Sequence, residues 1–366
     1  MKILIMGFTK IKYMPYLNFY LDSIDAGTNE VHVLYWNRDL KEEKLERLSG
    51  CVLHEFRCYQ EDDVPKFQKI KSFLSYRSYV KRILEQERFD RIFVLHSLPG
   101  VLVADHLIKK YSDRYVLDYR DSTYEGFRPF RNLIGRLVEN SVATFVSSRG
   151  FMCYMPEQFK DKIYVSHNLL MDSLSHRDER TSNAVSSDKI RIAFWGFVRH
   201  VEINKVIIEK IAKDDRFELH YYGREQQQAV LLKKYAMEIG ARNVFFHGEY
   251  LPEDRYRFVR STDLIHNIYD DGNMRLAMAN KYYDGIIFRI PQLCMQDSYM
   301  AKRATQTGTG FSVNPMDENF SDQIYAVYMK LNAEEFAHHC DLELQQVLSE
   351  YNAGVEVIHS ITSLNT

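Results

Sequence analysis

The strongest constraint on the fold is an alternation of short apolar, β-branched runs with longer helical patterns. Strands that alternate with helices form right-handed βαβ units, whose strands lie in a parallel sheet with helices on both faces. The alternation stops in a polar stretch at 168–188 and begins again at Ile190. The sequence therefore predicts an α/β protein built from two successive units, each with its own parallel sheet.

Boundaries follow from the same pattern. In the first half we expect strands at 3–6, 31–35, 52–56, 91–95, 114–117, 143–146 and 162–165, and helices at 14–24, 66–87, 99–111 and 126–140. In the second half we expect strands at 190–196, 217–222, 244–246 and 263–266, with apolar runs at 288–293 and 311–313. The helices expected there are at 201–213, 225–239, 252–260, 274–286, 319–333 and 341–363.

The chain has 366 residues, which fits two domains at roughly 100–200 residues each. We expect an N-terminal domain over 1–185, ending in the linker at about 168–188, and a C-terminal domain over 186–345. The last segment, 346–366, is expected to be a helix that could pack back on the N-terminal domain.

Composition narrows the class of protein. The formal net charge is −2, which argues against a nucleic-acid binder, since such proteins are usually strongly basic. The five cysteines form no C-x-x-C pair, so neither a disulfide framework nor a zinc knuckle is indicated. The apolar run at the N-terminus is too short for a signal-peptide core. We expect a cytoplasmic protein, attached at most to the inner face of the membrane.

Charge is divided unevenly along the chain. Residues 1–185 carry a net +3 and residues 186–366 a net −5. Much of the basic excess lies at 64–84, where no acidic residue occurs. The apolar residues there have spacings that would gather them on one side of a helix: Phe67, Ile70, Phe73, Leu74, Val80 and Leu84. Such a helix could lie on an anionic bilayer, or it could be a packed helix with a solvated basic face.

Several familiar sites are absent from the sequence. It has no G-x-G-x-x-G after the first strand and no G-x-x-x-x-G-K-[ST], so a dehydrogenase or P-loop nucleotidase is not indicated. G-x-S-x-G and H-E-x-x-H are also missing. No two aspartates are separated by one residue, so we expect neither an Asp-x-Asp metal clamp nor any other metal site, and no cofactor.

One candidate anion site follows the first strand of the second half. Trp195 and Gly196 end that strand, and a helix begins a few residues later. A helix N-terminus presents free backbone N–H groups and the positive end of its dipole, where a diphosphate could bind. Arg199 and Lys205 could neutralise that diphosphate as it leaves, or they could be ordinary surface cations.

The second candidate is the block from Ile268 to Pro291. We expect its helix to begin after Gly272, which would place Asn280, Lys281 and Asp284 within one turn near the helix end. A carboxylate such as Asp284 can accept hydrogen bonds from both hydroxyls of a ribose. Lys281 could reach a phosphate or pair with Asp284.

These motifs resemble those of GT-B-fold glycosyltransferases from bacterial capsule, O-antigen and exopolysaccharide pathways. The block Asn280-Lys281-Tyr282-Tyr283-Asp284-Gly285, closed by Pro291, is similar to their N-K-aromatic-x-E/D signature. Similar places, in the same order as in that family, are Val116-Leu117-Asp118-Tyr119-Arg120-Asp121, Tyr222-Gly223-Arg224, 243–250 and 309–313. One departure is that many retaining members have two glutamates where this chain has Leu276 and Asp284.

The resemblance implies two Rossmann-like domains that face each other across a cleft. The C-terminal domain would hold a nucleotide-sugar donor without a metal, and the N-terminal domain would hold the acceptor. The donor residues implied in this sequence are Gly196, Arg199, Lys205, Arg224, Asn273, Asn280, Lys281 and Asp284.

The acceptor side of the prediction rests on two strand ends. Asp121 is the first candidate for contact with the acceptor hydroxyl, because that hydroxyl needs a nearby group able to take its proton. Asp121 could equally cap the next helix or pair with Arg120. His96, at another strand end, is the second candidate.

The expected function is sugar transfer from a nucleotide diphosphate donor to a hydroxyl of a glycan acceptor, which we expect to be lipid-linked. The segment 64–84 would bring the acceptor domain to the membrane surface. Two alternatives stay open: an epimerase or phosphorylase on the same two-domain plan, and a catalytically silent protein that binds nucleotide sugar or scaffolds a polysaccharide complex.

Overall fold

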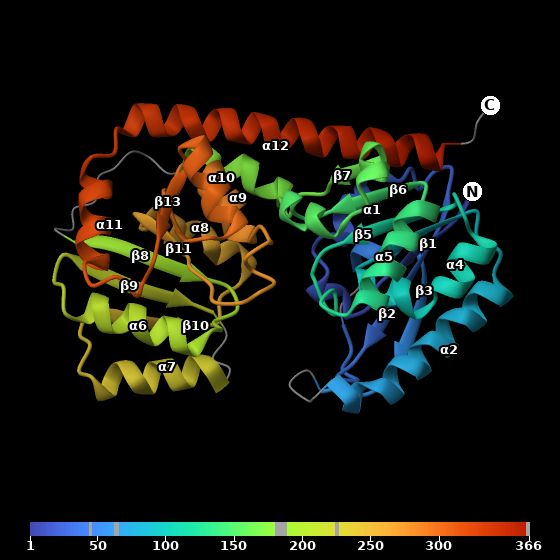
Figure 1. Ribbon diagram of the computed structural model, residues 1–366, viewed down its shortest axis with the longest axis horizontal. Coiled ribbons are helices and arrows are strands. Elements are labelled where there is room, and N and C mark those ends of the chain that lie inside the picture. Colours follow the sequence, from blue (N-terminus) through green and yellow to red (C-terminus); the bar gives the residue numbers. More distant parts are fainter. Residues whose placement is uncertain (44–45, 62–65, 180–188, 224–226, 364–366) are drawn as a thin grey trace. The chain divides into compact units, whose positions relative to one another are not determined.

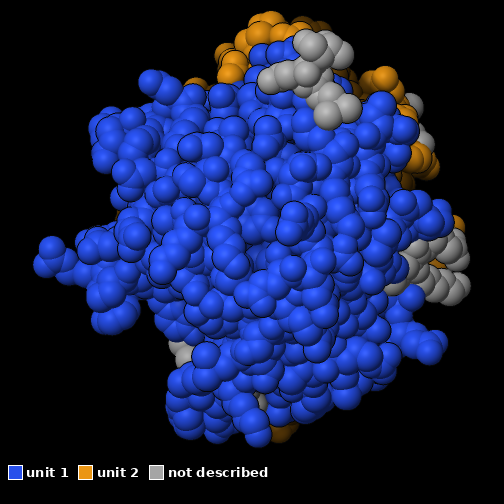
Figure 2. All heavy atoms as spheres, turned by 90° about the vertical axis from the view of Figure 1, so that its right-hand side faces the viewer, with its two compact units in different colours: residues 1–167, 348–366 blue, residues 168–347 orange. Residues whose placement is uncertain are grey.

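The computed structural model describes residues 1–366 except 44–45, 62–65, 180–188, 224–226 and 364–366 (Figure 1). The chain divides into two compact units. Unit 1 comprises Met1–His167 and Leu348–Thr366, and unit 2 comprises Asn168–Val347. Figure 2 shows unit 1 in blue as a closely packed body on the face that it presents.

In the part of the chain that the structure describes, unit 1 holds a seven-stranded sheet of order β3-β2-β1-β4-β5-β6-β7. Its strands are β1 (Lys2–Met6), β2 (Glu30–Asn37), β3 (Val52–Arg57), β4 (Arg91–Leu95), β5 (Tyr115–Tyr119), β6 (Ala143–Val146) and β7 (Ile163–Val165). Its helices are α1 (Leu17–Ser23), α2 (Ile70–Gln86), α3 (Ser97–Leu102), α4 (Ala104–Lys110), α5 (Arg128–Asn140) and the C-terminal part of α12 (Ala333–Thr362).

Within the described residues, unit 2 holds a six-stranded sheet of order β10-β9-β8-β11-β12-β13. Its strands are β8 (Ile190–Trp195), β9 (Phe217–Tyr222), β10 (Val244–Gly248), β11 (Leu264–Asn267), β12 (Gln292–Met295) and β13 (Gly310–Val313). Its helices are α6 (Val201–Ala212), α7 (Gln227–Glu238), α8 (Arg255–Arg260), α9 (Asn280–Ile287), α10 (Tyr299–Thr307), α11 (Phe320–Met329) and the N-terminal part of α12.

Every strand pairing in both sheets is parallel, for example β1 with β2 and β8 with β9. In each unit the strand order reverses direction beside the first strand, β1 or β8. The prediction of two Rossmann-like parallel-sheet units is therefore confirmed. Open sheets of this kind place ligands beyond the carboxyl ends of their strands, near the point where the strand order reverses.

The polar stretch that we expected to be a linker is structured in its first part. Residues Met171–Glu179 form a 3-10 helix in unit 2. Arg255 of α8 donates to the fully buried Ser173, and the ring of His176 stacks on Tyr256 at 3.7 Å. Along the chain, unit 1 therefore ends at His167 and unit 2 begins at Asn168, instead of the expected boundary at 185/186, because polar side chains in this stretch find partners on α8. The rest of the expected linker, 180–188, lies outside the described residues.

The helix expected at 274–286 is shorter than the sequence indicated, and that prediction was wrong at its start. Ala279 is extended, and α9 begins at Asn280. In a longer helix the carbonyl of Arg275 would accept from the N–H of Ala279, but here it accepts from the N–H of Tyr299 at 2.7 Å. Asn280 and Lys281 therefore open the helix instead of lying near its end.

The apolar residues that we expected on one side of a helix in 64–84 differ in how far they are buried. Val80 and Leu84 are buried within unit 1, whereas Phe67, Ile70 and Leu74 are exposed. The exposed residues lie at the start of α2 and in the turn before it, and the buried ones lie toward the end of α2.

Candidate functional site

The turn between β8 and α6 brings two backbone segments of unit 2 very close together. Gly196 has a φ of +115°, a conformation that L side chains rarely adopt. A Cβ built at Gly223, at the end of β9, would overlap the carbonyl oxygen of Gly196. Both positions therefore require glycine, and the loop that leads from Gly196 to α6 follows the carboxyl edge of the sheet.

The first turn of α6 keeps its backbone donors available for a ligand. Its N-cap is His200, in a left-handed conformation with φ of +61°, and no side chain caps the helix. Asn204 instead donates to the carbonyls of Arg199 and His200, at 2.7 and 3.0 Å, which holds the loop against the helix. Uncapped N–H groups at the positive end of a helix dipole form an anion site.

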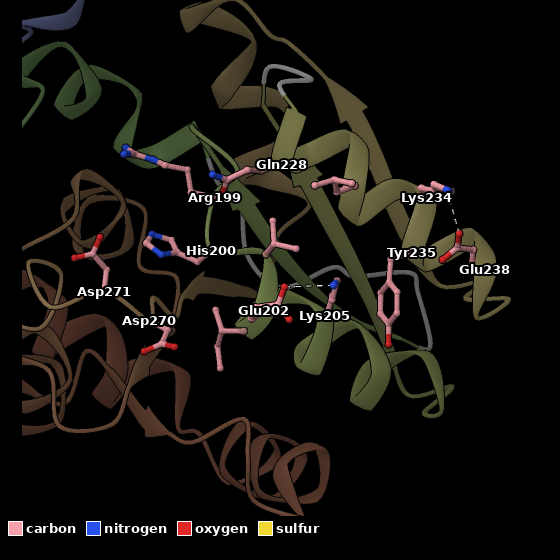
Figure 3. Close-up of a pocket in the computed structure, with 13 residues that line it drawn as sticks. Arg199, His200, Glu202, Lys205, Gln228, Lys234, Tyr235, Glu238, Asp270 and Asp271 are labelled. Carbon is pink, nitrogen blue, oxygen red and sulfur yellow. Dashed lines mark hydrogen bonds and ion pairs between the residues drawn. The ribbon is translucent and has the colours of Figure 1, made fainter. Parts of the chain in front are cut away.

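A hollow of about 780 Å³ opens beside this helix start, and we call it the α6 hollow (Figure 3). It is lined by residues of α6, α7 and two loops: Arg199, His200, Val201, Glu202, Ile203, Lys205, Gln228, Leu231, Lys234, Tyr235, Glu238, Asp270 and Asp271. The structure thus brings the predicted residues Arg199 and Lys205 to one site. Figure 3 shows them with Asp270 and Asp271 on the opposite loop.

Charge in the α6 hollow is mixed. Lys205 pairs with Glu202 at 3.3 Å, and Lys234 pairs with Glu238 at 3.5 Å, so these cations are partly neutralised. The guanidinium of Arg199 lies 4.8 Å from the ring centre of Phe197 and belongs to an exposed residue. A cation and free N–H groups on one side, with carboxylates on the other, suit a ligand that carries both phosphate and hydroxyl groups.

Lys281, in the first turn of α9, is buried against aromatic side chains of unit 2. Its residue is 7% exposed, and Nζ lies 3.9 Å from the ring centre of Phe194 and 5.1 Å from that of Tyr269. Burial lowers the pKa of Lys281 from 10.5 to about 7, although the carboxylate of Asp284 opposes this change. Lys281 is not among the residues that line the α6 hollow.

Asp284 is buried one turn further along α9. Trp195 Nε1 donates to its Oδ2 at 2.8 Å, and Arg255 lies 3.5 Å from its Oδ1. Burial raises the pKa of this carboxyl, although Arg255 and Trp195 oppose that shift. Asp284 is 4% exposed, and each of its two carboxylate oxygens has a partner within unit 2. Its contact with a ribose remains a prediction.

The other predicted donor residues are dispersed. Asn273 lies in the loop after β11, where its N–H donates to Asp271 Oδ1 at 2.7 Å. Asn280 is exposed at the start of α9 and does not line the α6 hollow. Arg224 lies outside the described residues.

Unit 1 brings its two predicted acceptor residues together. His96 and Asp121 follow the adjacent strands β4 and β5, and Nε2 of His96 lies 3.7 Å from Oδ2 of Asp121. His96 has a φ of +85°, and its Nδ1 accepts from the N–H of Leu98 at 3.3 Å. Since Nδ1 is an acceptor, the neutral ring carries its proton on Nε2 and points it at Asp121.

A buried ion pair lies beside this dyad. Asp118 and Arg120 are 0% and 4% exposed, and Arg120 Nε donates to Asp118 Oδ2 at 2.8 Å. Arg120 also donates to Ser166 and lies 4.2 Å from the ring centre of Tyr16. These contacts use Arg120 within the core of unit 1, whereas the side chain of Asp121 at this edge is 52% exposed.

Some residues of the site were not found from the sequence. Asp270 stood in the block that we singled out, and the acidic pair that it forms with Asp271 after a strand could have marked it. Gln228 and Tyr235 reach the α6 hollow only because α7 packs beside α6, and no local pattern marks them. Among the described residues, no three His, Cys, Asp or Glu side chains gather as they would around a metal ion.

Comparison with known proteins defines the class of fold. No family model and no curated protein sequence matches this chain. Solved structures do match: a glycosyltransferase from Rickettsia africae has 11% sequence identity and a TM-score of 0.68, with 100% of each chain covered. HepE from Anabaena in complex with UDP has 13% identity and a TM-score of 0.65, covering 98% of this chain and 100% of that chain. The chain therefore has the glycosyltransferase type of two-domain fold, GT-B.

Other matching structures widen the chemistry found on this fold. HepE was also solved with UDP-glucose, at 14% identity and a TM-score of 0.65, covering 100% of both chains. A UDP-N-acetylglucosamine 2-epimerase described as putative, from Listeria monocytogenes, has 12% identity and a TM-score of 0.56, covering 93% of this chain and 91% of that chain. Among the described helices of this protein, none is long and apolar enough to cross a bilayer.

Proposed function

We propose that this protein is a glycosyltransferase that moves a sugar from a nucleotide diphosphate donor to a hydroxyl of a lipid-linked glycan, in the synthesis of a surface polysaccharide. The observation that carries the proposal is the uncapped start of α6, which opens on the α6 hollow beside Arg199 in a chain of GT-B fold. The complexes of HepE with UDP and UDP-glucose support a nucleotide-sugar donor.

In this proposal, unit 2 stabilises the leaving group. The N–H groups of the first turn of α6, with Arg199 and Lys205, would bind the diphosphate and stabilise its charge as the sugar leaves, without a divalent metal. Asp270 and Asp271 would accept hydrogen bonds from sugar hydroxyls on the opposite side of the α6 hollow.

Unit 1 would supply the acceptor residues. Asp121 would take the proton of the acceptor hydroxyl, because its carboxylate is exposed at the carboxyl edge of the sheet. His96 would be a positioning residue, since one of its ring nitrogens faces a backbone N–H and the other faces Asp121.

The test is calorimetric titration with a panel of nucleotide sugars, in the presence and absence of EDTA, followed by a nucleotide-release assay with glycan acceptors. Arg199→Ala should weaken donor binding about tenfold or more, because it removes a charge-assisted contact. Lys213→Ala, at the opposite end of α6, is the matched control and should bind normally. Asp121→Asn should leave donor binding unchanged and slow transfer. Normal donor binding by Arg199→Ala, or turnover only with a metal, would contradict the proposal.

The match to the structure described as a putative UDP-N-acetylglucosamine 2-epimerase favours one alternative, epimerisation of the donor sugar on the same fold. An epimerase would convert the sugar while it remains on the nucleotide and would need no acceptor. Chromatography of the nucleotide sugar after incubation without acceptor separates the two: a new epimer supports the alternative, whereas unchanged donor with acceptor-dependent nucleotide release supports transfer.

A further inference from the structure

The outer face of α2 carries exposed apolar side chains that do not pack in the core of unit 1. Phe67, in the 3-10 turn Lys66–Lys69, and Ile70 and Leu74, in α2, follow one another at spacings of three and four and so form one line, which we call the α2 stripe. Their exposed fractions are 69%, 55% and 56%. Another face of α2, with Tyr76 and Val80 at 0% exposure, already packs against the sheet of unit 1.

This geometry differs from that of an ordinary surface helix, whose apolar residues turn inward and whose outer face is polar. Three large apolar side chains in one exposed line indicate a surface that becomes covered in use. Figure 1 shows α2 as a long helix along the outside of unit 1, beside the edge strand β3.

Cations border the α2 stripe. A hollow of about 670 Å³ beside it is lined by Phe56, Lys71, Leu74, Ser75, Ser78, Tyr79 and Arg82. Both Lys71 and Arg82 are exposed, and the guanidinium of Arg82 lies 5.2 Å from the ring centre of Tyr79. Farther along α2, Arg77 and Lys81 pair with Asp105 at 3.0 and 2.6 Å, so they contribute less positive charge.

The start of α2 adds to this positive potential. No acidic residue lies in its first turn, and the positive end of the helix dipole lies there. The sequence also places Glu61, Asp62 and Asp63 just before this segment. These acidic residues offset part of the positive charge, so electrostatic attraction alone would bind an anionic surface weakly. The apolar α2 stripe must therefore supply part of the affinity.

We infer that this face of unit 1 docks on an anionic lipid bilayer. Phe67, Ile70 and Leu74 enter the boundary between headgroups and acyl chains, and Lys71 and Arg82 contact lipid phosphates. An apolar line bordered by long basic side chains has the chemistry of a helix that lies in the membrane interface. This inference uses no residue of the proposed transfer reaction, so the two can fail separately.

The test is flotation of the purified full-length protein with vesicles of phosphatidylglycerol and phosphatidylcholine, or of phosphatidylcholine alone, at low and high salt. The protein should float with the anionic vesicles at low salt, and binding should weaken as salt screens the cations. The combined variant Phe67→Ser, Ile70→Ser and Leu74→Ser should lose binding at least about tenfold, because it removes the apolar contribution.

The matched control is Met237→Ser with Leu251→Ser, which removes two large side chains of unit 2 that are 74% and 61% exposed. It should bind anionic vesicles like the unchanged protein. The charge-reversal variant Lys71→Glu with Arg82→Glu should lose binding at low salt. The inference is overturned if the unchanged protein fails to float with anionic vesicles, if the control loses as much binding as the stripe variant, or if light scattering shows a dimer that only the stripe variant dissociates.

Discussion

Replacement of Lys281 by Met should stabilise unit 2, and the gain should depend on pH. The ammonium lies beside the rings of Phe194 and Tyr269 in a residue that is 7% exposed, and burial lowers its pKa from 10.5 to about 7. A change of this size corresponds to about 5 kcal/mol of preference for the neutral amine in the folded state. Methionine has a similar length and carries no charge to desolvate.

The direction with pH follows from proton counts. Between pH 7 and 10.5 the unfolded chain holds a proton on Lys281 that the folded chain has lost, so the stability of the unchanged protein rises with pH across this window. The loss of unfolding free energy caused by burying Lys281 is largest below about pH 7. It falls to about 2 kcal/mol near pH 9 and vanishes above the pKa of the lysine in the unfolded chain. The Met variant lacks this dependence, so its advantage should shrink by about 2 kcal/mol from pH 7 to pH 9.

The assay is urea unfolding followed by tryptophan fluorescence. The chain has two tryptophans, Trp36 in unit 1 and Trp195 in unit 2, so a Trp36→Phe background reports on unit 2 alone. Lys234→Met is the control, because its side chain is 74% exposed and should change stability little at either pH. Two results would refute the burial argument. One is a stability advantage of Lys281→Met over the unchanged protein that stays constant from pH 7 to 9. The other is a Met variant that is less stable than the unchanged protein, by more at pH 7 than at pH 9.

Two further predictions concern backbone approach and buried charge. Gly223→Ala should destabilise unit 2 by about 1–3 kcal/mol or more, because the new methyl group would overlap the carbonyl oxygen of Gly196; an unchanged urea midpoint from Trp195 fluorescence would contradict this. Asp118→Asn should cost unit 1 about 3–5 kcal/mol, because it leaves the guanidinium of Arg120 buried without its counter-ion; unfolding followed by Trp36 fluorescence should show this loss, and a change near zero would count against it.

The strands were the most predictable part of the fold. The bounds expected for β4, β6 and β9 agree with those in the structure. Strands of a central parallel sheet are buried on both faces, so each reads as an apolar run between polar residues. The alternation of such runs with helices was also enough to predict two parallel sheets.

Part of the site was predictable for the same reason. Gly196 and Arg199 lie where a strand end leads into a helix start, and this connection is local in the sequence. His96 and Asp121 each follow a strand, so the sequence could name them as candidates. Their approach to 3.7 Å required β4 and β5 to be neighbours in the sheet.

Periodicity and turn residues by themselves determined the α/β class, the two-unit plan and the strand ends that carry chemistry, because these depend on contacts between residues close in sequence. Only the tertiary structure decided which side chains face solvent. It started α9 at Asn280, buried Lys281 and Asp284, and turned Phe67, Ile70 and Leu74 outward. The physical reason is that burial and hydrogen-bond partners come from distant segments, as when Tyr299 takes the carbonyl of Arg275 that would have continued a helix.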